Sequence, residues 1–237
     1  MRHRSPLPRA LRARPFTVAE GRALGLSASR LREPDLRTPF HGVRVSEALP
    51  DELPLRCRAA SLLLPAGSAF SGRTAVALLR LPTPWLRPGT PVPQQAAGEG
   101  PLEVAVAPGV RRPRIEGVVV RPRRLPPAAD LTDRGGVRVL QPQDAWAQRC
   151  ATLAAGDAGD AGDAVRRTRS LEQVAAAAGE LPPDERQRAL EVLALVRPGV
   201  ESPLETLVRL ALHDAGLPAP DPVCGAAVPA GDHPVAW

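Results

Sequence analysis

The spacing of apolar and polar residues between positions 15 and 45 predicts two short helices and a strand. Thr17 is followed three residues later by Glu20, the pattern of a capping box, so a helix is expected to start near Val18. Gly25 is suited to end this helix, because glycine readily adopts the left-handed conformation found at helix ends.

A second helix is expected from about residue 28 to residue 33, with Ser27 as its cap and Pro34 as its end. Two helices joined by a turn of about three residues have helix-turn-helix geometry. The segment 39–45 follows as a wing strand whose two valines face inward. Residues 15–45, called the head below, are therefore predicted to be a winged helix-turn-helix that binds double-stranded DNA.

The head carries the side chains that we expect to meet DNA. The second helix offers basic and hydroxyl groups to the groove, and the wing adds groups that can contact phosphates. The expected DNA-binding residues of the head are Arg22, Ser27, Ser29, Arg30, Arg32, Arg37, His41 and Arg44. The net charge of +6 and the clustered arginines suit a polyanionic partner. The use of arginine with no lysine is typical of GC-rich coding.

Residues 46–152 are expected to form a small α+β module. Helical spacing covers 53–64 and 71–79, and a proline- and glycine-rich loop follows at 82–101. Three valine-rich stretches then alternate as strands do, at 102–107, 117–121 and 137–140. The whole chain is therefore predicted to belong to the α+β class.

The first two of these strands are expected to form a hairpin rich in arginine. Its connection carries Arg111, Arg112 and Arg114. These side chains would supply a second phosphate-contacting surface beside the helix-turn-helix, which positions a protein on DNA without reading bases. The alternative is a solvated hairpin whose charges keep an edge strand from pairing with other chains.

The segments outside these modules are expected to be an arm, a linker and helices. Residues 1–14 are basic and rich in proline, which predicts a loose arm that is either a tether on DNA or a disordered terminus. The repeat GDAGDAGDA at 156–164 predicts a flexible linker over 153–169. Within 170–237, helical spacing covers 170–178, 183–196 and 203–215.

Cysteine usage and hydropathy bound the setting of the protein. The three cysteines, Cys57, Cys150 and Cys224, are far apart and odd in number, which favours a reducing cytoplasm over a disulfide framework. The longest apolar runs fall far short of the roughly 20 residues that cross a bilayer, so no membrane partner is expected. The histidines show no metal-ligand spacing with the cysteines, and no cofactor is expected.

The order of segments resembles a family of actinobacterial proteins that begin like AbiEi-type antitoxins and end in a domain similar to the very-short-patch-repair (Vsr) endonucleases. The likeness rests on PFTVAEGRALGLSASRLREPDLRTPFHGVRV, LPLRCRAASLLLPAGSAFSGRTAVALLRLP, LEVAVAPGVRRPRIEGVVVRPRRLPP and ESPLETLVRLALHDAGLP, and it covers nearly the whole chain. AbiEi-type antitoxins bind their own promoter through the winged helix and repress a toxin operon. The resemblance therefore implies an autorepressor with a cognate toxin encoded in the same operon.

The resemblance also places Glu205 at the glutamate of a Ser-Pro-x-Glu motif in the nuclease-like domain. In the family, acidic residues on the following strands complete a site for Mg²⁺. The sequence ends at Trp237, about where the first of those strands is expected, and Asp232 matches a turn better than a ligand position. We therefore expect an incomplete restriction-endonuclease-like domain, no bound Mg²⁺ and a vestigial Glu205.

The sequence leaves three hypotheses about function. The first is a DNA-binding transcriptional regulator. The second is a truncated, catalytically inactive protein of the Vsr-like endonuclease family. The third is a protein–protein interaction module whose arginines stay solvated.

Overall fold

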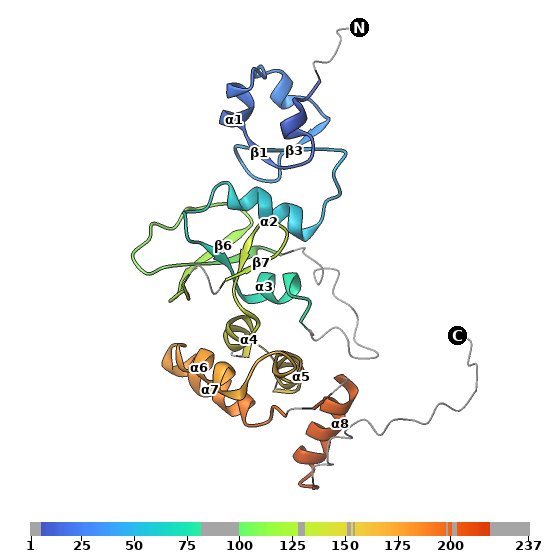
Figure 1. Cartoon of the computed structure of the whole chain (residues 1–237), viewed down its shortest axis with the longest axis vertical. Helices are drawn as coiled ribbons and strands as arrows, with labels where there is room; N and C mark the ends of the chain where they lie inside the picture. Colours follow the sequence, from blue (N-terminus) through green and yellow to red (C-terminus); the bar gives the residue numbers. More distant parts are fainter. Residues whose placement is uncertain are drawn as a thin grey trace, which may run out of the picture.

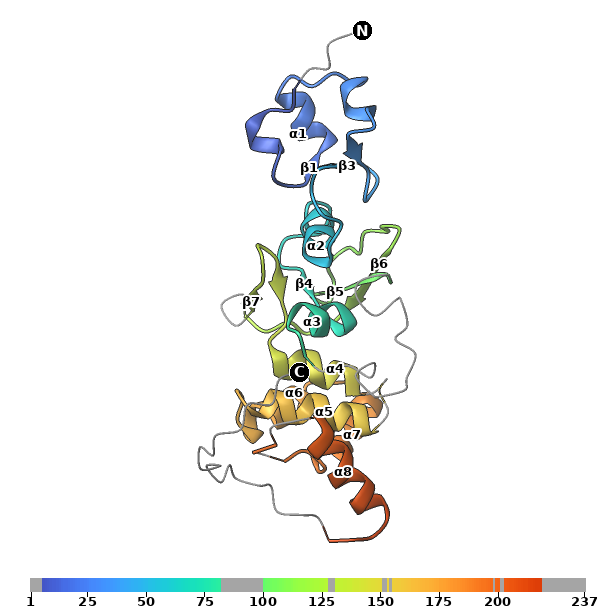
Figure 2. The same ribbon diagram turned by 90° about the vertical axis from the view of Figure 1, so that its right-hand side faces the viewer.

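The computed structural model describes residues 6–81, 100–127, 131–150, 153, 155–197, 199–200 and 203–218. Its elements follow one long axis: the head lies at one end, a small sheet with helices comes next, and a group of helices forms the other end (Figure 1). The view turned by 90° shows the same order (Figure 2). Helices and strands are both present, which confirms the predicted α+β class.

The head contains a small antiparallel sheet and short helical segments. Its elements are β1 (Phe16–Thr17), α1 (Val18–Ala23), η2 (Arg30–Arg32), β2 (Leu36–Arg37) and β3 (Val43–Ser46), and η1 (Arg9–Leu11) precedes them, where η denotes a 3₁₀ helix. The strands are ordered β1-β3-β2. Along the chain, the helical segments α1 and η2 precede the β2–β3 hairpin. The strands β1 and β2 are additional to the prediction for the head.

Helix α1 starts and ends where the sequence pattern predicts. The Thr17 hydroxyl accepts a hydrogen bond from the Glu20 amide at 3.1 Å, and Gly25 has a φ of +84° just beyond the helix. The Glu20 carboxylate binds the Arg14 guanidinium, and the Thr17 backbone amide, the cap amide of the predicted capping box, is a second and weaker partner. This hydrogen-bonded pairing lowers the pKa of Glu20.

The second helix is shorter than predicted. Instead of a helix over 28–33, the structure has the single 3₁₀ turn η2. Ser27 still caps it, because its hydroxyl accepts a hydrogen bond from the Arg30 amide at 3.2 Å. Pro34 disfavours the helical conformation at the residue before it, and Glu33 is extended, so too few residues remain for an α-helix.

The prediction of a loose arm is wrong for residues 6–14. Leu7 and Leu11 are 8% and 0% exposed and belong to the buried cluster that also contains Phe16 and Leu31 of the head. The apolar side chains of η1 thus bury enough surface to order this segment against the head. Residues 1–5 lie outside the described residues.

The middle module is built on a five-stranded mixed sheet. Its strands are β4 (Ala69–Phe70), β5 (Leu102–Val106), β6 (Val118–Pro122), β7 (Thr132–Asp133) and β8 (Arg138–Val139), in the order β6-β5-β4-β8-β7. The three predicted strands are confirmed as β5, β6 and β8, and the two predicted helices as α2 (Leu53–Ser61) and α3 (Gly72–Leu78). Most of the predicted loop at 82–101 lies outside the described residues.

The prediction that β5 and β6 form a hairpin is wrong. The two strands run parallel, with Leu102 opposite Val118 and Val106 opposite Pro122. A parallel pair needs a connection of about a dozen residues that returns along the strand, and 107–117 provides nearly that length. This connection is called the arginine loop below, because it carries the three arginines singled out above.

The wing of the head shares its core with the middle module. Phe40, Val43 and Val45 belong to the same buried cluster as Leu55 and Cys57 of α2. The inward orientation predicted for the two wing valines is therefore confirmed. Apolar packing, rather than a linker, joins the head to the middle module.

The far end of the molecule is a group of helices around Trp146. They are α4 (Pro142–Cys150), α5 (Ala155–Arg166), α6 (Leu171–Gly179), α7 (Pro183–Leu193) and α8 (Pro203–Asp214). Helices α6, α7 and α8 confirm the three predicted helical stretches. Within the described ranges, every helix is too short or too polar to span a bilayer.

The flexible-linker prediction for 153–169 is wrong, because the GDA repeat forms the central helix α5. Ala158, Ala161 and Val165 are spaced three and four residues apart and are buried, and the Trp146 Nε1 donates to the Ala158 carbonyl at 2.8 Å. A Cβ added at Gly162 would lie 2.5 Å from a methyl group of Val196. Small residues on this face allow close packing, which outweighs the low helix propensity of glycine.

A buried polar cluster fixes α8 to α5. The Asp163 carboxylate, which is 2% exposed, accepts hydrogen bonds from the Thr206 hydroxyl at 2.7 Å and from Arg209 Nη2 at 2.9 Å. It also accepts one from the Arg197 amide at 2.7 Å. The outer side of α8 is apolar and exposed, with Leu204 66% accessible.

Candidate nucleic-acid interface

The surface formed by α1 and η2 keeps four of the predicted DNA-binding residues exposed. They are Arg22, Ser27, Ser29 and Arg32. The two serine hydroxyls lie 2.9 Å apart, and Arg32 Nε donates to the Ala28 carbonyl at 3.1 Å. These interactions orient the turn while leaving the charged ends of Arg22 and Arg32 without a carboxylate partner among the described residues.

Arg30 does not face solvent as predicted. Only 5% of it is exposed, and its two terminal nitrogens each bind one oxygen of Asp35 at 2.8 Å. A bidentate pair of this kind holds a guanidinium in one orientation. Arg30 therefore holds η2 to the start of β2, and the prediction that it contacts DNA is corrected.

Arg44 also makes hydrogen bonds within the fold. It is half-buried, and its Nε donates to the Leu31 carbonyl at 2.7 Å while Nη1 donates to the Val43 carbonyl at 2.9 Å. The side chain thus ties the wing strand β3 to η2. Its predicted role on the phosphate backbone is replaced by a structural one.

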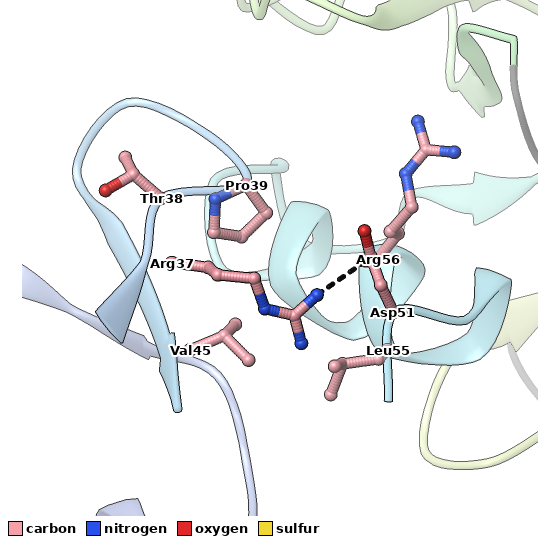
Figure 3. Close-up of a pocket in the computed structure, with 7 residues that line it drawn as sticks. All are labelled: Arg37, Thr38, Pro39, Val45, Asp51, Leu55 and Arg56. Carbon is pink, nitrogen blue, oxygen red and sulfur yellow. Dashed lines mark ion pairs between the residues drawn. The ribbon is translucent and has the colours of Figure 1, made fainter. Parts of the chain in front are cut away.

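Arg37 connects the wing to the segment before α2 (Figure 3). Its Nη1 lies 3.2 Å from Asp51 Oδ1, its Nε lies 3.2 Å from Glu47 Oε2, and its Nη2 donates to the Leu49 carbonyl. These contacts turn the Arg37 guanidinium toward the segment before α2, so Arg37 connects two parts of the fold. His41 is the wing residue that remains exposed.

The arginine loop remains available to a polyanion. Arg111, Arg112 and Arg114 are exposed, and the described residues place no carboxylate against them. The arginines at the end of β6 differ, since Arg123 binds Glu185 and Arg124 binds Glu180, each at 2.8 Å. The basic patch predicted for this region is thus divided between a free loop and two arginines that bind the sheet edge to α6 and α7.

The loop and the wing are neighbours in space. A Cβ added at Gly117, at the base of the arginine loop, would lie 3.9 Å from the Phe40 ring. Phe40 is itself 6% exposed and anchored in the core that the wing shares with α2. The structure thus holds the base of the arginine loop close to the wing.

Glu205 lies in the first turn of α8 and is exposed. The next residue, Thr206, points into the buried cluster around Asp163, and its hydrogen bond to the Asp163 carboxylate helps to position α8. Within the described part of the chain, no group of three His, Cys, Asp or Glu side chains could hold a metal ion. Ser202, the other half of the predicted motif, and Asp232 lie outside the described residues.

Sequence patterns did not reveal the acidic partners of the arginines. Asp35 follows Arg30 by five residues across an irregular turn, and Asp51 approaches Arg37 from the next segment. Neither spacing matches the three- or four-residue interval at which ion pairs form on a helix. The signal that could have indicated these pairs is the number of acidic residues close in sequence to the arginines of residues 30–52.

Comparison with known proteins gives a likeness of fold. No protein-family model and no curated protein matches the chain. Among solved structures, it is similar to the RV2827C protein from Mycobacterium tuberculosis, with a TM-score of 0.53 and 20% sequence identity over 77% of this chain and 72% of that one. At this identity the likeness concerns the arrangement of elements alone.

Proposed function

We propose that this chain is a DNA-binding protein of the AbiEi antitoxin type that represses transcription of its own operon. The observation that carries the proposal is the distribution of exposed arginines that have no carboxylate partner among the described residues. Arg22 and Arg32 are exposed on the head, and the arginine loop adds three more beside the wing. A surface of this kind binds the phosphate backbone by releasing counterions.

The head supplies orientation and the loop supplies affinity. The α1–η2 unit offers Ser27, Ser29 and Arg32 on one short turn, which suits contact with base edges and adjacent phosphates. The arginine loop extends the contact beyond the head along the same duplex. The resemblance to AbiEi-type antitoxins adds the regulatory role and a cognate toxin gene in the same operon.

Fluorescence anisotropy with a duplex from the region upstream of the gene tests the proposal. We expect salt-dependent binding that is tighter than binding to a scrambled duplex. Replacing all three loop arginines by alanine should weaken binding to both duplexes and reduce the slope of log K against log salt by about 0.9 for each lost phosphate contact.

The matched control is Arg138→Ala, an exposed arginine on β8 at the other side of the sheet. It should leave affinity and slope unchanged. Arg32→Ala should reduce the preference for the upstream duplex, because a base-contacting arginine contributes about 1–3 kcal/mol of discrimination. Equal binding of both duplexes by the intact chain would rule out an operator-specific regulator.

A further inference from the structure

A cavity of about 330 Å³ lies between the wing and α2 (Figure 3). This volume is at the lower end of the range for small-molecule sites, which are about 300–1,000 Å³. The cavity separates two elements that otherwise share a core. Its lining residues are Arg37, Thr38, Pro39, Val45, Asp51, Leu55 and Arg56.

The polar groups of the lining favour an anion. Arg37 and Arg56 bring two positive charges, and Asp51 brings one negative charge. Arg37 Nε is buried and has no acceptor aligned for a hydrogen bond, although Glu47 lies within ion-pair distance. Within the described part of the chain, Arg56 makes a single long hydrogen bond, from Nη2 to the Gly100 carbonyl at 3.4 Å. Donor capacity therefore remains on both guanidiniums.

The carboxylates beside Arg37 are easily replaced. Asp51 and Glu47 are 67% and 57% exposed, so water solvates them and their attraction to Arg37 is weak. A carboxylate inside the cavity would be less solvated and would meet Arg37 and Arg56 together. Charge-assisted bonds strengthen as water is excluded.

Apart from Thr38, the remaining lining is apolar. Pro39 and Val45 of the wing line the cavity opposite Leu55 of α2. A ligand with a compact hydrocarbon body would bury this surface, while its charged end reaches the guanidiniums. We infer that the cavity binds a small carboxylate with a compact apolar body.

Such a ligand would act on the wing. Arg37 lies in β2, directly before the turn that carries His41, and its contact with Asp51 ties this strand to the segment before α2. A ligand carboxylate that replaces Asp51 beside Arg37 removes this ion pair between β2 and the segment before α2. This effect rests on the proposed function: the bound ligand alters the affinity of the head for DNA, and DNA reciprocally alters the affinity for the ligand.

Titration calorimetry of the full chain with benzoate, in the absence of DNA, tests the site. Benzamide has nearly the same shape but no charge, and it should bind at least about tenfold more weakly, as expected when a charge-assisted bond is lost. Arg56→Met should weaken benzoate binding by about tenfold or more. Arg138→Met, which removes an exposed arginine outside the cavity, should leave benzoate binding unchanged.

Three results would overturn the site. The first is no saturable heat at about 10 mM benzoate, a concentration tenfold above a Kd of about 1 mM. The others are equal affinity for benzamide and benzoate, and an Arg56→Met variant that binds benzoate like the intact chain. Anisotropy with and without saturating benzoate then tests the regulatory part, which falls if DNA affinity does not change. Because the calorimetry contains no DNA, a failure of DNA binding and a failure of the cavity are distinguished.

Discussion

At the scale of single residues, the arginines of the head fall into two groups that composition alone does not separate. Arg30, Arg37 and Arg44 are held by Asp35, by Glu47 and Asp51, and by backbone carbonyls. Arg22 and Arg32 remain exposed. The first group contributes to stability and the second to the proposed contact with DNA, so the two groups should respond differently to substitution.

Substitution of Arg30 tests this division. We expect Arg30→Met to lower the free energy of unfolding by about 2 kcal/mol, less than the 3–5 kcal/mol of a fully buried pair because Asp35 is 31% exposed. Arg32→Met should change it by no more than about 0.5 kcal/mol. Urea denaturation of both variants measures the difference, and equal stabilities would show that the Arg30–Asp35 pair contributes nothing.

The two described cysteines give a second expectation at this scale. Burial raises the pKa of the Cys57 and Cys150 thiols from 9.0 to about 12. Little thiolate forms at pH 8, so alkylation of both should be slow in the native protein and fast in guanidinium chloride, as peptide mapping by mass spectrometry would show. Since the folded pKa is raised, the stability linked to these thiols is lost as pH rises from 9.0 to about 12. Rapid native labelling would contradict their burial.

At the scale of elements, regular helices and the longer strands could be predicted, and packing decided the rest. Thr17 and Gly25 mark the ends of α1 through local chemistry, so sequence alone located them. The GDA repeat of α5 has no such local signal. Its helix depends on Trp146 and Val196, which are distant in sequence. The parallel pairing of β5 and β6 is likewise set by the sheet as a whole.

Two helical glycines should respond with opposite signs to alanine. Gly162→Ala places a methyl group against Val196 and Trp146, so we expect a loss of about 1–3 kcal/mol in stability despite the gain in helix propensity. Gly179, in α6, has no atom within 4 Å of the added methyl group, and Gly179→Ala should stabilise by up to about 1 kcal/mol. Thermal unfolding compares the two variants. Stabilisation by both would contradict close packing at α5.

At the scale of the whole molecule, the shared core makes the head and the middle module one mechanical unit. The candidate site spans both, because the α1–η2 surface and the arginine loop belong to different modules. The sequence predicted a second basic surface beside the helix-turn-helix, but it did not indicate which contact brings the two surfaces together. Phe40 packs in the shared core and lies close to Gly117 at the base of the loop.

Phe40→Ala should weaken both modules together. We expect a loss of about 3 kcal/mol from the cavity it leaves. Native-state hydrogen exchange followed by mass spectrometry should show faster exchange in β3 and in β5 by similar factors, because both pack on the same core. Leu11→Ala, in the separate cluster of the head, is the comparison variant. Faster exchange confined to β3 in Phe40→Ala would show that the modules open independently.

The position of β4 in the middle sheet has a consequence for how the chain folds. This strand of two residues pairs with β5 on one side and, in parallel, with β8 on the other, where Phe70 meets Val139. The pairing of Phe70 with Val139 closes a loop that contains all of the chain between them. Closing so long a loop is entropically costly, and contacts of high sequence separation slow folding. During synthesis, therefore, the sheet cannot be completed until β8 has left the ribosome. We expect the head to acquire its final support only after more than half of the chain has been made.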